Sequence, residues 1–120
     1  MADDKKSLVE LDNATFAAEA HEPDGSWVDV LHGSLSDDFR LRRGIGEIEN
    51  RERMITRLSR AEPVKRERIG DPDVAVLKDT AVVCSRVRVP MGTFKNAKLF
   101  ERTPGGWRCV YWRVTREQES

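Results

Sequence analysis

The sequence lacks three features that would each indicate a particular class of protein. No apolar run approaches the ~20 residues needed to span a bilayer. The first residues contain no apolar segment of the kind found in secretory signals. There is no excess of either charge, because 21 basic and 21 acidic residues give a formal net charge of zero. We therefore expect a soluble, cytoplasmic protein without a membrane partner, and the net charge gives no argument for binding nucleic acid.

Cysteine is also scarce. Cys84 and Cys109 are the two cysteines of the chain, and each stands in an apolar, strand-like context that favours a reduced core residue over a disulfide. A metal site would need more ligands than these, so we expect neither a metal nor a cofactor. At 120 residues the chain has the size of one domain, and we expect a single domain over residues 1–120.

The first half of the sequence predicts three helices. Ser7 and Glu10 form a capping-box pattern, Gly33 follows an apolar helical stripe, and Asn50 is a suitable N-cap. The predicted helices cover residues 7–20, 26–33 and 51–62, with residues 1–6 frayed and with breaks at Pro23 and Pro63.

Period-two alternation predicts strands in the rest of the chain. The predicted strands cover residues 38–43, 64–69, 74–77, 81–90, 94–102 and 107–115. Pro72 has no amide hydrogen, so we expect a bulge or a sheet edge there. The TPGG segment at residues 103–106 predicts a hairpin turn.

This order of elements indicates an α+β protein, because helices come first and a run of antiparallel strands ends the chain. Long strands with alternating faces form a sheet that twists and curls. We therefore expect a curved antiparallel or mixed sheet wrapped on the N-terminal helices, with a conical hollow between them.

Three short stretches resemble motifs of the nuclear transport factor 2-like superfamily, which includes the SnoaL-like polyketide cyclases, ketosteroid isomerase and scytalone dehydratase. Residues 35–39 (LSDDF) are similar to Leu-x-Asp-Asp-Phe, residues 77–83 (LKDTAVV) to Gly-Asp-Thr-Ala-Val-Val, and residues 106–110 (GWRCV) to Gly-x-Trp-Lys-Ile-Val. In order, the resemblance covers about residues 8–115. It implies a SnoaL-like domain with a cystatin-like cone, whose function the fold does not specify.

Two functions are compatible with this resemblance. The first is binding of a small apolar or aromatic ligand in the conical pocket, with or without cofactor-independent lyase, isomerase or hydrolase activity. The alternative is a non-catalytic protein-interaction or assembly module with a filled cone. In either case we expect a homodimer through the sheet, since zero net charge leaves self-association unopposed.

The resemblance also implies what a catalytic site would contain, namely an Asp or His in the cone as general acid or base. The candidate catalytic residues are His32, with Asp29 or Asp38 as its orienting carboxylate, and Tyr111 as a hydrogen-bond donor. The alternatives are a structural role at a helix end for His32 and turn chemistry for Asp38. The final strand has no carboxylate where the cyclases carry an acid, which argues against cyclase or isomerase activity.

Large side chains with one polar atom suit a pocket for a flat organic ligand. The candidate pocket residues are Trp27, Met91, Asn96 and Trp112. The alternative is that these side chains fill the cone. In a regular strand Tyr111 and Trp112 would point to opposite faces, so only one of them could point inward.

Arginines recur at i, i+2 spacing on three predicted strands. The three pairs are Arg40/Arg42, Arg66/Arg68 and Arg86/Arg88. If their faces coincide, the sheet presents a cationic patch for an acidic partner; the alternatives are a solvated outer face or a dimer interface. We do not expect nucleic-acid binding, because no aromatic residues interleave with these arginines.

Overall fold

The computed structural model describes residues 2–19, 25–44, 47–62 and 64–117. Within these ranges the chain forms helices and strands in nearly the predicted order. The helices are α1 (Ala2–Glu19), α2 (Ser26–Ser34) and α3 (Arg51–Arg60). The strands are β1 (Leu35–Arg43), β2 (Glu47–Asn50), β3 (Glu67–Leu77), β4 (Thr80–Val89), β5 (Gly92–Thr103) and β6 (Gly106–Arg116).

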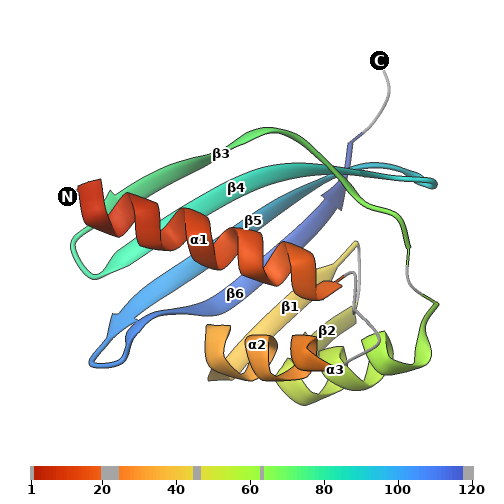
Figure 1. The fold of residues 1–120 in the computed structure, drawn as a ribbon, viewed down its shortest axis with the longest axis horizontal. Helices are drawn as coiled ribbons and strands as arrows, with labels where there is room; N and C mark the ends of the chain where they lie inside the picture. The colour runs from red at the N-terminus through yellow and green to blue at the C-terminus, as the bar shows by residue number, and fades with distance from the viewer. Residues whose placement is uncertain (1, 20–24, 45–46, 63, 118–120) are drawn as a thin grey trace.

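All six of these strands belong to one sheet, in the order β2-β1-β6-β5-β4-β3. Strands β1 and β6 pair in parallel, and every other neighbouring pair is antiparallel. In Figure 1 the long strands form a curved surface, α1 lies across one face of it, and α2 and α3 lie by the β1–β2 end. The α+β class with a curved mixed sheet is therefore confirmed.

The helices are held in place by a cluster of apolar side chains from the helices and from the inner face of the sheet. Burying one such side chain contributes about 1.5–3 kcal/mol relative to leaving it exposed. The fully or nearly fully buried members of this cluster include Leu8, Leu31, Leu35, Phe39, Leu41, Met54, Val83, Phe100 and Trp112. The core therefore lies between the three helices and one face of the sheet.

A bulge in β6 changes which residues face this core. Phe100 pairs with Cys109 while Leu99 pairs with Tyr111, so Val110 is an extra residue in β6. A strand with such an extra residue changes the alternation of its faces. As a result, Cys109 and Trp112 are both buried, and the strict alternation predicted for residues 107–115 is wrong across this point.

The first helix begins earlier than predicted. The carboxylate of Asp4 accepts hydrogen bonds from the Arg102 guanidinium at 3.0 and 2.8 Å, which ties the first turn of α1 to the β5–β6 hairpin. The bond from Arg102 is also the main cause that lowers the pKa of Asp4. Ser7 consequently lies within the helix, and both the capping box and the frayed residues 2–6 are wrong predictions.

Of the other local predictions, the cap of α3 and the irregularity at Pro72 are confirmed, and β2 was missed. Asn50 does cap α3, because its side chain accepts from the Arg53 amide at 2.8 Å. Strand β3 is an edge strand whose register shifts between Ile69 and Asp73, as expected around Pro72, but it continues as one strand through that point. Strand β2 was not predicted. The predicted breaks at Pro23 and Pro63 lie outside the described residues.

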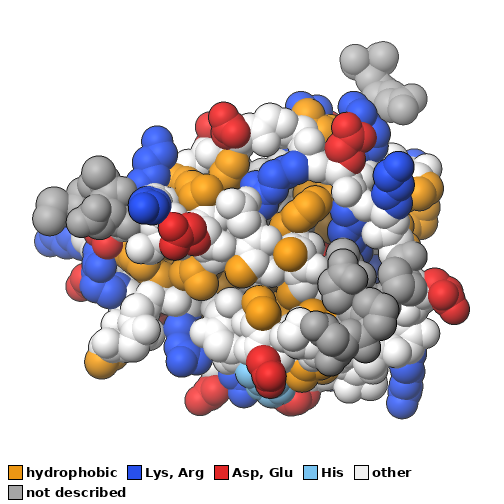
Figure 2. Space-filling view, in the orientation of Figure 1, with side chains coloured by type: hydrophobic (Ala, Val, Ile, Leu, Met, Phe, Trp, Pro, Cys, Tyr) orange, Lys and Arg blue, Asp and Glu red, His pale blue; other side chains and the backbone are white. Residues whose placement is uncertain are grey.

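None of the described helices has the length and apolar character that crossing a membrane requires. On the side of the molecule that Figure 2 shows, basic and acidic side chains of the described residues are interspersed with apolar ones. This face therefore presents no continuous surface of one charge.

Candidate functional site

A pocket of about 480 Å³ opens beside the C-terminal end of α1, where β1, β4 and β6 end and β5 begins. This volume lies within the range of roughly 300–1,000 Å³ typical of small-molecule sites. Its apolar lining consists of Leu41, Val64, Val87, Val89, Met91, Phe94 and Val114. Its polar lining consists of Glu19, Arg43, Glu47, Arg57, Arg66 and Asn96, with Gly44 at the rim.

Asn96 is the most deeply buried polar side chain of this lining, with an exposed fraction of 6%. Its Oδ1 accepts a hydrogen bond of 2.7 Å from the indole Nε1 of Trp112. An indole N–H can only donate, so this bond fixes which end of the amide carries the oxygen. The amide nitrogen of Asn96 is therefore turned away from Trp112.

Arg66 and Glu19 face each other across another part of the lining. Arg66 Nη1 lies 3.7 Å from Glu19 Oε2, which is an ion pair but is longer than a charge-assisted hydrogen bond. The Nε–H of Arg66 is buried and has no hydrogen-bond partner among the described residues. Glu19 is the last residue of α1, and Arg66 directly precedes β3.

Arg57 is held more firmly. Its Nε donates to both carboxylate oxygens of Glu49, at 3.0 and 2.9 Å. Arg43 and Glu47 are exposed at the rim, and Met91 projects into solvent with an exposed fraction of 65%. The mouth of the pocket is thus charged, and its walls are apolar.

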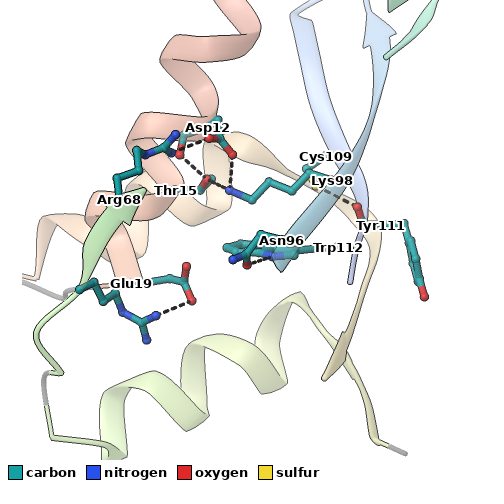
Figure 3. A network of polar contacts seen from close by, with 10 residues as sticks. Asp12, Thr15, Glu19, Arg68, Asn96, Lys98, Cys109, Tyr111 and Trp112 are labelled. Carbon is teal, nitrogen blue, oxygen red and sulfur yellow. Dashed lines mark hydrogen bonds and ion pairs between the residues drawn. The ribbon is translucent and has the colours of Figure 1, made fainter. Parts of the chain in front are cut away.

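Beyond Asn96 the cone is filled by a buried polar network. Lys98 Nζ donates to Asp12 Oδ1 at 2.7 Å and to Thr15 Oγ1 at 2.7 Å. The same ammonium lies 4.1 Å from the centre of the Trp112 ring, which adds a cation–π contact. Arg68 donates to the second carboxylate oxygen of Asp12. Figure 3 shows α1 supplying Asp12 and Thr15 above the side chain of Lys98.

Cys109 lies in the same interior. Burial raises the pKa of its thiol to about 12, although the nearby charge of Lys98 opposes this shift. Cys84 is a free cysteine too and is half-buried. It pairs with Ala97, which flanks the inward-facing Asn96 and Lys98, so Cys84 lies on the outer face. The two cysteines therefore lie on opposite faces of the sheet, and Cys84 is not the core residue that was predicted.

Two of the four predicted pocket residues, Met91 and Asn96, do line the pocket. Trp112 does not line it but bounds it through the bond to Asn96. Trp27 is elsewhere, since its side chain is buried on α2 in the hydrophobic core.

The structure does not bring the four candidate catalytic residues together. His32 is partly exposed on α2, with its Nδ1 3.7 Å from Glu52, and Asp29 is exposed on the same helix. Asp38 is exposed and accepts from the Ser36 hydroxyl at 2.7 Å. Tyr111 pairs with Leu99 and Arg40 on the outer face and points away from the network in Figure 3. None of the four lines the pocket, and their catalytic roles remain predictions.

Sequence reasoning missed the buried polar residues. Asp12 follows Leu8 by four residues and precedes Thr15 by three, so its place on the buried stripe of α1 could have been noticed. Lys98 alternates with Asn96 and Phe100, which gives it the inner face of β5. The charge of both side chains argued against that placement, because charged groups are rarely buried unless they are paired.

The arginine pairs do not share one face. Arg66 and Arg68 turn inward to Glu19 and Asp12 on α1. The other four are exposed; of these, Arg86 and Arg88 pair with Glu117 and Glu67. A patch made of all three pairs is therefore absent from the described strands, because Arg66 and Arg68 lie on the inner face. No group of three or more His, Cys, Asp or Glu residues in the described ranges is placed to hold a metal ion.

Solved structures with this fold were compared with the chain. An NTF2-like protein from Cytophaga hutchinsonii ATCC 33406 superposes with a TM-score of 0.80 at 18% identity, over 94% of this chain and 98% of that one. An NTF2-like protein of unknown function from Silicibacter pomeroyi DSS-3 gives 0.80 at 15% identity, over 97% and 98% of the two chains.

An NTF2-like protein with a cystatin-like fold from Novosphingobium aromaticivorans gives a TM-score of 0.76 at 18% identity, over 99% of this chain and 85% of that one. No protein-family model and no curated protein matches the sequence. The chain thus has the cystatin-like fold of NTF2-like proteins, as the three sequence motifs predicted, with a conical pocket. At these identities the likeness concerns the fold alone.

Proposed function

We propose that this domain binds a small molecule with an apolar or aromatic body in the pocket at the open end of its cone. One observation carries the proposal: about 480 Å³ of open space is walled by strand side chains such as Val87 and Val114 and ends at the buried amide of Asn96. A mostly apolar wall with a few placed polar groups is the usual composition of a small-molecule site.

Binding is the function that this pocket supports best, and catalysis would need residues other than the four predicted ones. The carboxylates that line the pocket are Glu19 and Glu47. Cofactor-independent lyase, isomerase or hydrolase chemistry would therefore depend on these two side chains for acid–base catalysis.

We keep the cytoplasmic location as part of this proposal; fractionation of expressing cells would test it.

A thermal-shift screen against metabolites and aromatic compounds tests the binding function. A compound present at a hundred times its Kd should stabilise the fold by about 2.7 kcal/mol. In Val114→Trp a large side chain fills the pocket, so the stabilisation should disappear. Thr115→Trp is the matched control, because Thr115 is exposed on the same strand and does not line the pocket. If no compound stabilises the wild type, or if Val114→Trp responds equally, the proposal fails.

The outer face of the sheet supports the second part of the proposal, a homodimer. Val82 is 40% exposed there, and it pairs with Leu99, which pairs with Tyr111. All three described helices lie on the other face (Figure 1). This apolar centre has Arg40 and Arg42 on β1 to one side and Asp73 on β3 to the other.

A second copy in the opposite orientation would place Asp73 of one sheet over Arg40 and Arg42 of the other. Light scattering should then give twice the 13.7 kDa of one chain. Val82→Asp puts a charge in the apolar centre and should yield monomers, whereas Thr56→Asp on α3 should not. A wild type that has the mass of one chain would exclude the dimer. This face is also what the alternative assembly function would use, but the open pocket favours ligand binding.

A further inference from the structure

The buried amide of Asn96 has one bonded end and one end without a partner. Its oxygen accepts from Trp112 at 2.7 Å, and no side-chain or backbone acceptor among the described residues bonds its nitrogen. That nitrogen is not one of the buried, unpartnered side-chain atoms of the described residues, which are Arg66 Nε and Arg68 Nη1, so it is open to solvent. Because Asn96 lines the pocket, its two N–H donors face the pocket space.

This orientation is fixed from two sides. The indole of Trp112 can only donate, so the amide cannot rotate by half a turn without placing two donors against each other. The backbone of Asn96 is paired on both sides, with Ser85 on β4 and Val114 on β6. The donors are therefore held in place before any ligand arrives, as a preorganised recognition group should be.

A ligand that displaces solvent from this amide must supply an acceptor in its place, because a polar group that loses its bonds to water without a new partner costs free energy. Val87, Phe94 and Val114 of the walls are apolar, and the acceptors of the lining are the carboxylates of Glu19, which faces Arg66, and of Glu47, which is exposed at the rim. Arg66 also lines the pocket, with its guanidinium 3.7 Å from Glu19. The Asn96 amide is thus a donor that a ligand oxygen would match.

We propose that the ligand carries a carbonyl-type oxygen, in a ketone or a carboxylate, which accepts from the Asn96 amide at the closed end of the pocket. Its apolar body then packs against Val87, Phe94 and Val114. The inference rests on the binding function proposed above and adds the chemical class of the ligand. Asn96 is the residue that determines specificity, since a site built to donate to an oxygen discriminates against the analogue that lacks it.

Three probes with the same diphenyl body test this. Benzophenone carries a ketone, diphenylacetate a carboxylate, and diphenylmethane neither. Titration of the wild-type protein followed by NMR should give Kd values about tenfold lower for an oxygen-bearing probe than for diphenylmethane, which corresponds to about 1.4 kcal/mol. The side-chain amide resonances of Asn96 should shift with the oxygen-bearing probe and stay in place with the hydrocarbon.

Asn96→Asp supplies the matched variant. An aspartate keeps an oxygen for the Trp112 indole but presents an acceptor where the amide donors were. The advantage of the oxygen-bearing probe should vanish in this variant, while the Trp112 indole resonance reports that the fold is retained. If the variant does not fold, the comparison of probes in the wild type still decides the question.

The two oxygen-bearing probes show whether the ligand's oxygen belongs to a carboxylate or to a neutral carbonyl group. Tighter binding of diphenylacetate that is lost in Arg66→Gln indicates an anionic ligand, and equal or tighter binding of benzophenone indicates a neutral carbonyl compound. Equal affinity for all three probes with unshifted Asn96 resonances would overturn the inference and leave the binding function standing. If none of the probes binds, or if Val114→Trp binds them all unchanged, both proposals are overturned.

Discussion

Replacing Asp12 with alanine is expected to destabilise the protein by about 3–5 kcal/mol, because the substitution leaves a buried cation without its counter-charge. Asp12 is fully buried, and Lys98 has an exposed fraction of 2%. Without the carboxylate, the Lys98 ammonium keeps, among the described residues, the Thr15 hydroxyl and the face of Trp112 as partners. Urea denaturation of wild type and variant at neutral pH measures the difference in the free energy of unfolding.

Lys98→Met is the informative control. It removes the cation but leaves Asp12 bonded to Arg68, whose side chain reaches the surface with 19% exposure. Its cost should therefore be smaller than that of Asp12→Ala. The double substitution Asp12→Leu with Lys98→Met should recover part of the loss, because the buried Lys98 cation is removed with its partner and the remaining Arg68 side chain reaches the surface. An Asp12→Ala variant within about 1 kcal/mol of wild type would show that the buried pair is not formed.

Trp112→Ala is the second substitution with a large expected effect, a loss of about 3–5 kcal/mol. The ring is 1% exposed, packs edge-on against Phe39 at a centroid distance of 6.4 Å, and carries the ammonium of Lys98 on its face. Its removal leaves a cavity next to that cation. It also removes the ring to which Asn96 is bonded at the closed end of the ligand pocket, so the pocket should extend inward past Asn96.

Trp112→Phe separates the contribution of ring packing to stability from the contribution of the indole N–H hydrogen bond. Phenylalanine keeps most of the apolar contact and a face for Lys98, but it leaves the Asn96 oxygen without its donor. We expect a loss of about 1–3 kcal/mol, the cost of a buried acceptor left unpaired. Thermal and urea unfolding of both variants would check the order. If the phenylalanine variant were less stable than the alanine variant, ring packing would not be the larger contribution of Trp112 to stability.

The fold followed from patterns that a sequence displays directly. Alternation on β4, from Ala81 to Val89, identified a strand with one buried face, and helical spacing identified the buried face of α2. Asn50 was recognisable as a cap because its side chain acts on residues next to it in the chain. Local signals of this kind depend on near neighbours, which are visible without knowing the fold.

The candidate site was only partly predictable. Asn96 and Met91 were placed in the pocket from residue type, whereas Glu19 and Arg66 were not, because they belong to segments far apart in the chain. His32 was a candidate because histidine titrates near neutral pH, but the side on which α2 packs turned it toward Glu52 and away from the hollow.

By itself the sequence determined the α+β class, the order of most elements and the strands that form the cone, because periodicity and turn residues act over short distances. Tertiary structure decided the rest. One extra residue in β6 selected Trp112 over Tyr111 for the interior. The partners Asp12 and Lys98, 86 residues apart, made burial of two charges possible by pairing them. The Trp112 ring and the Asp12–Lys98 pair fill the inner part of the cone. The open pocket lies at its mouth, with the amide of Asn96 at the closed end.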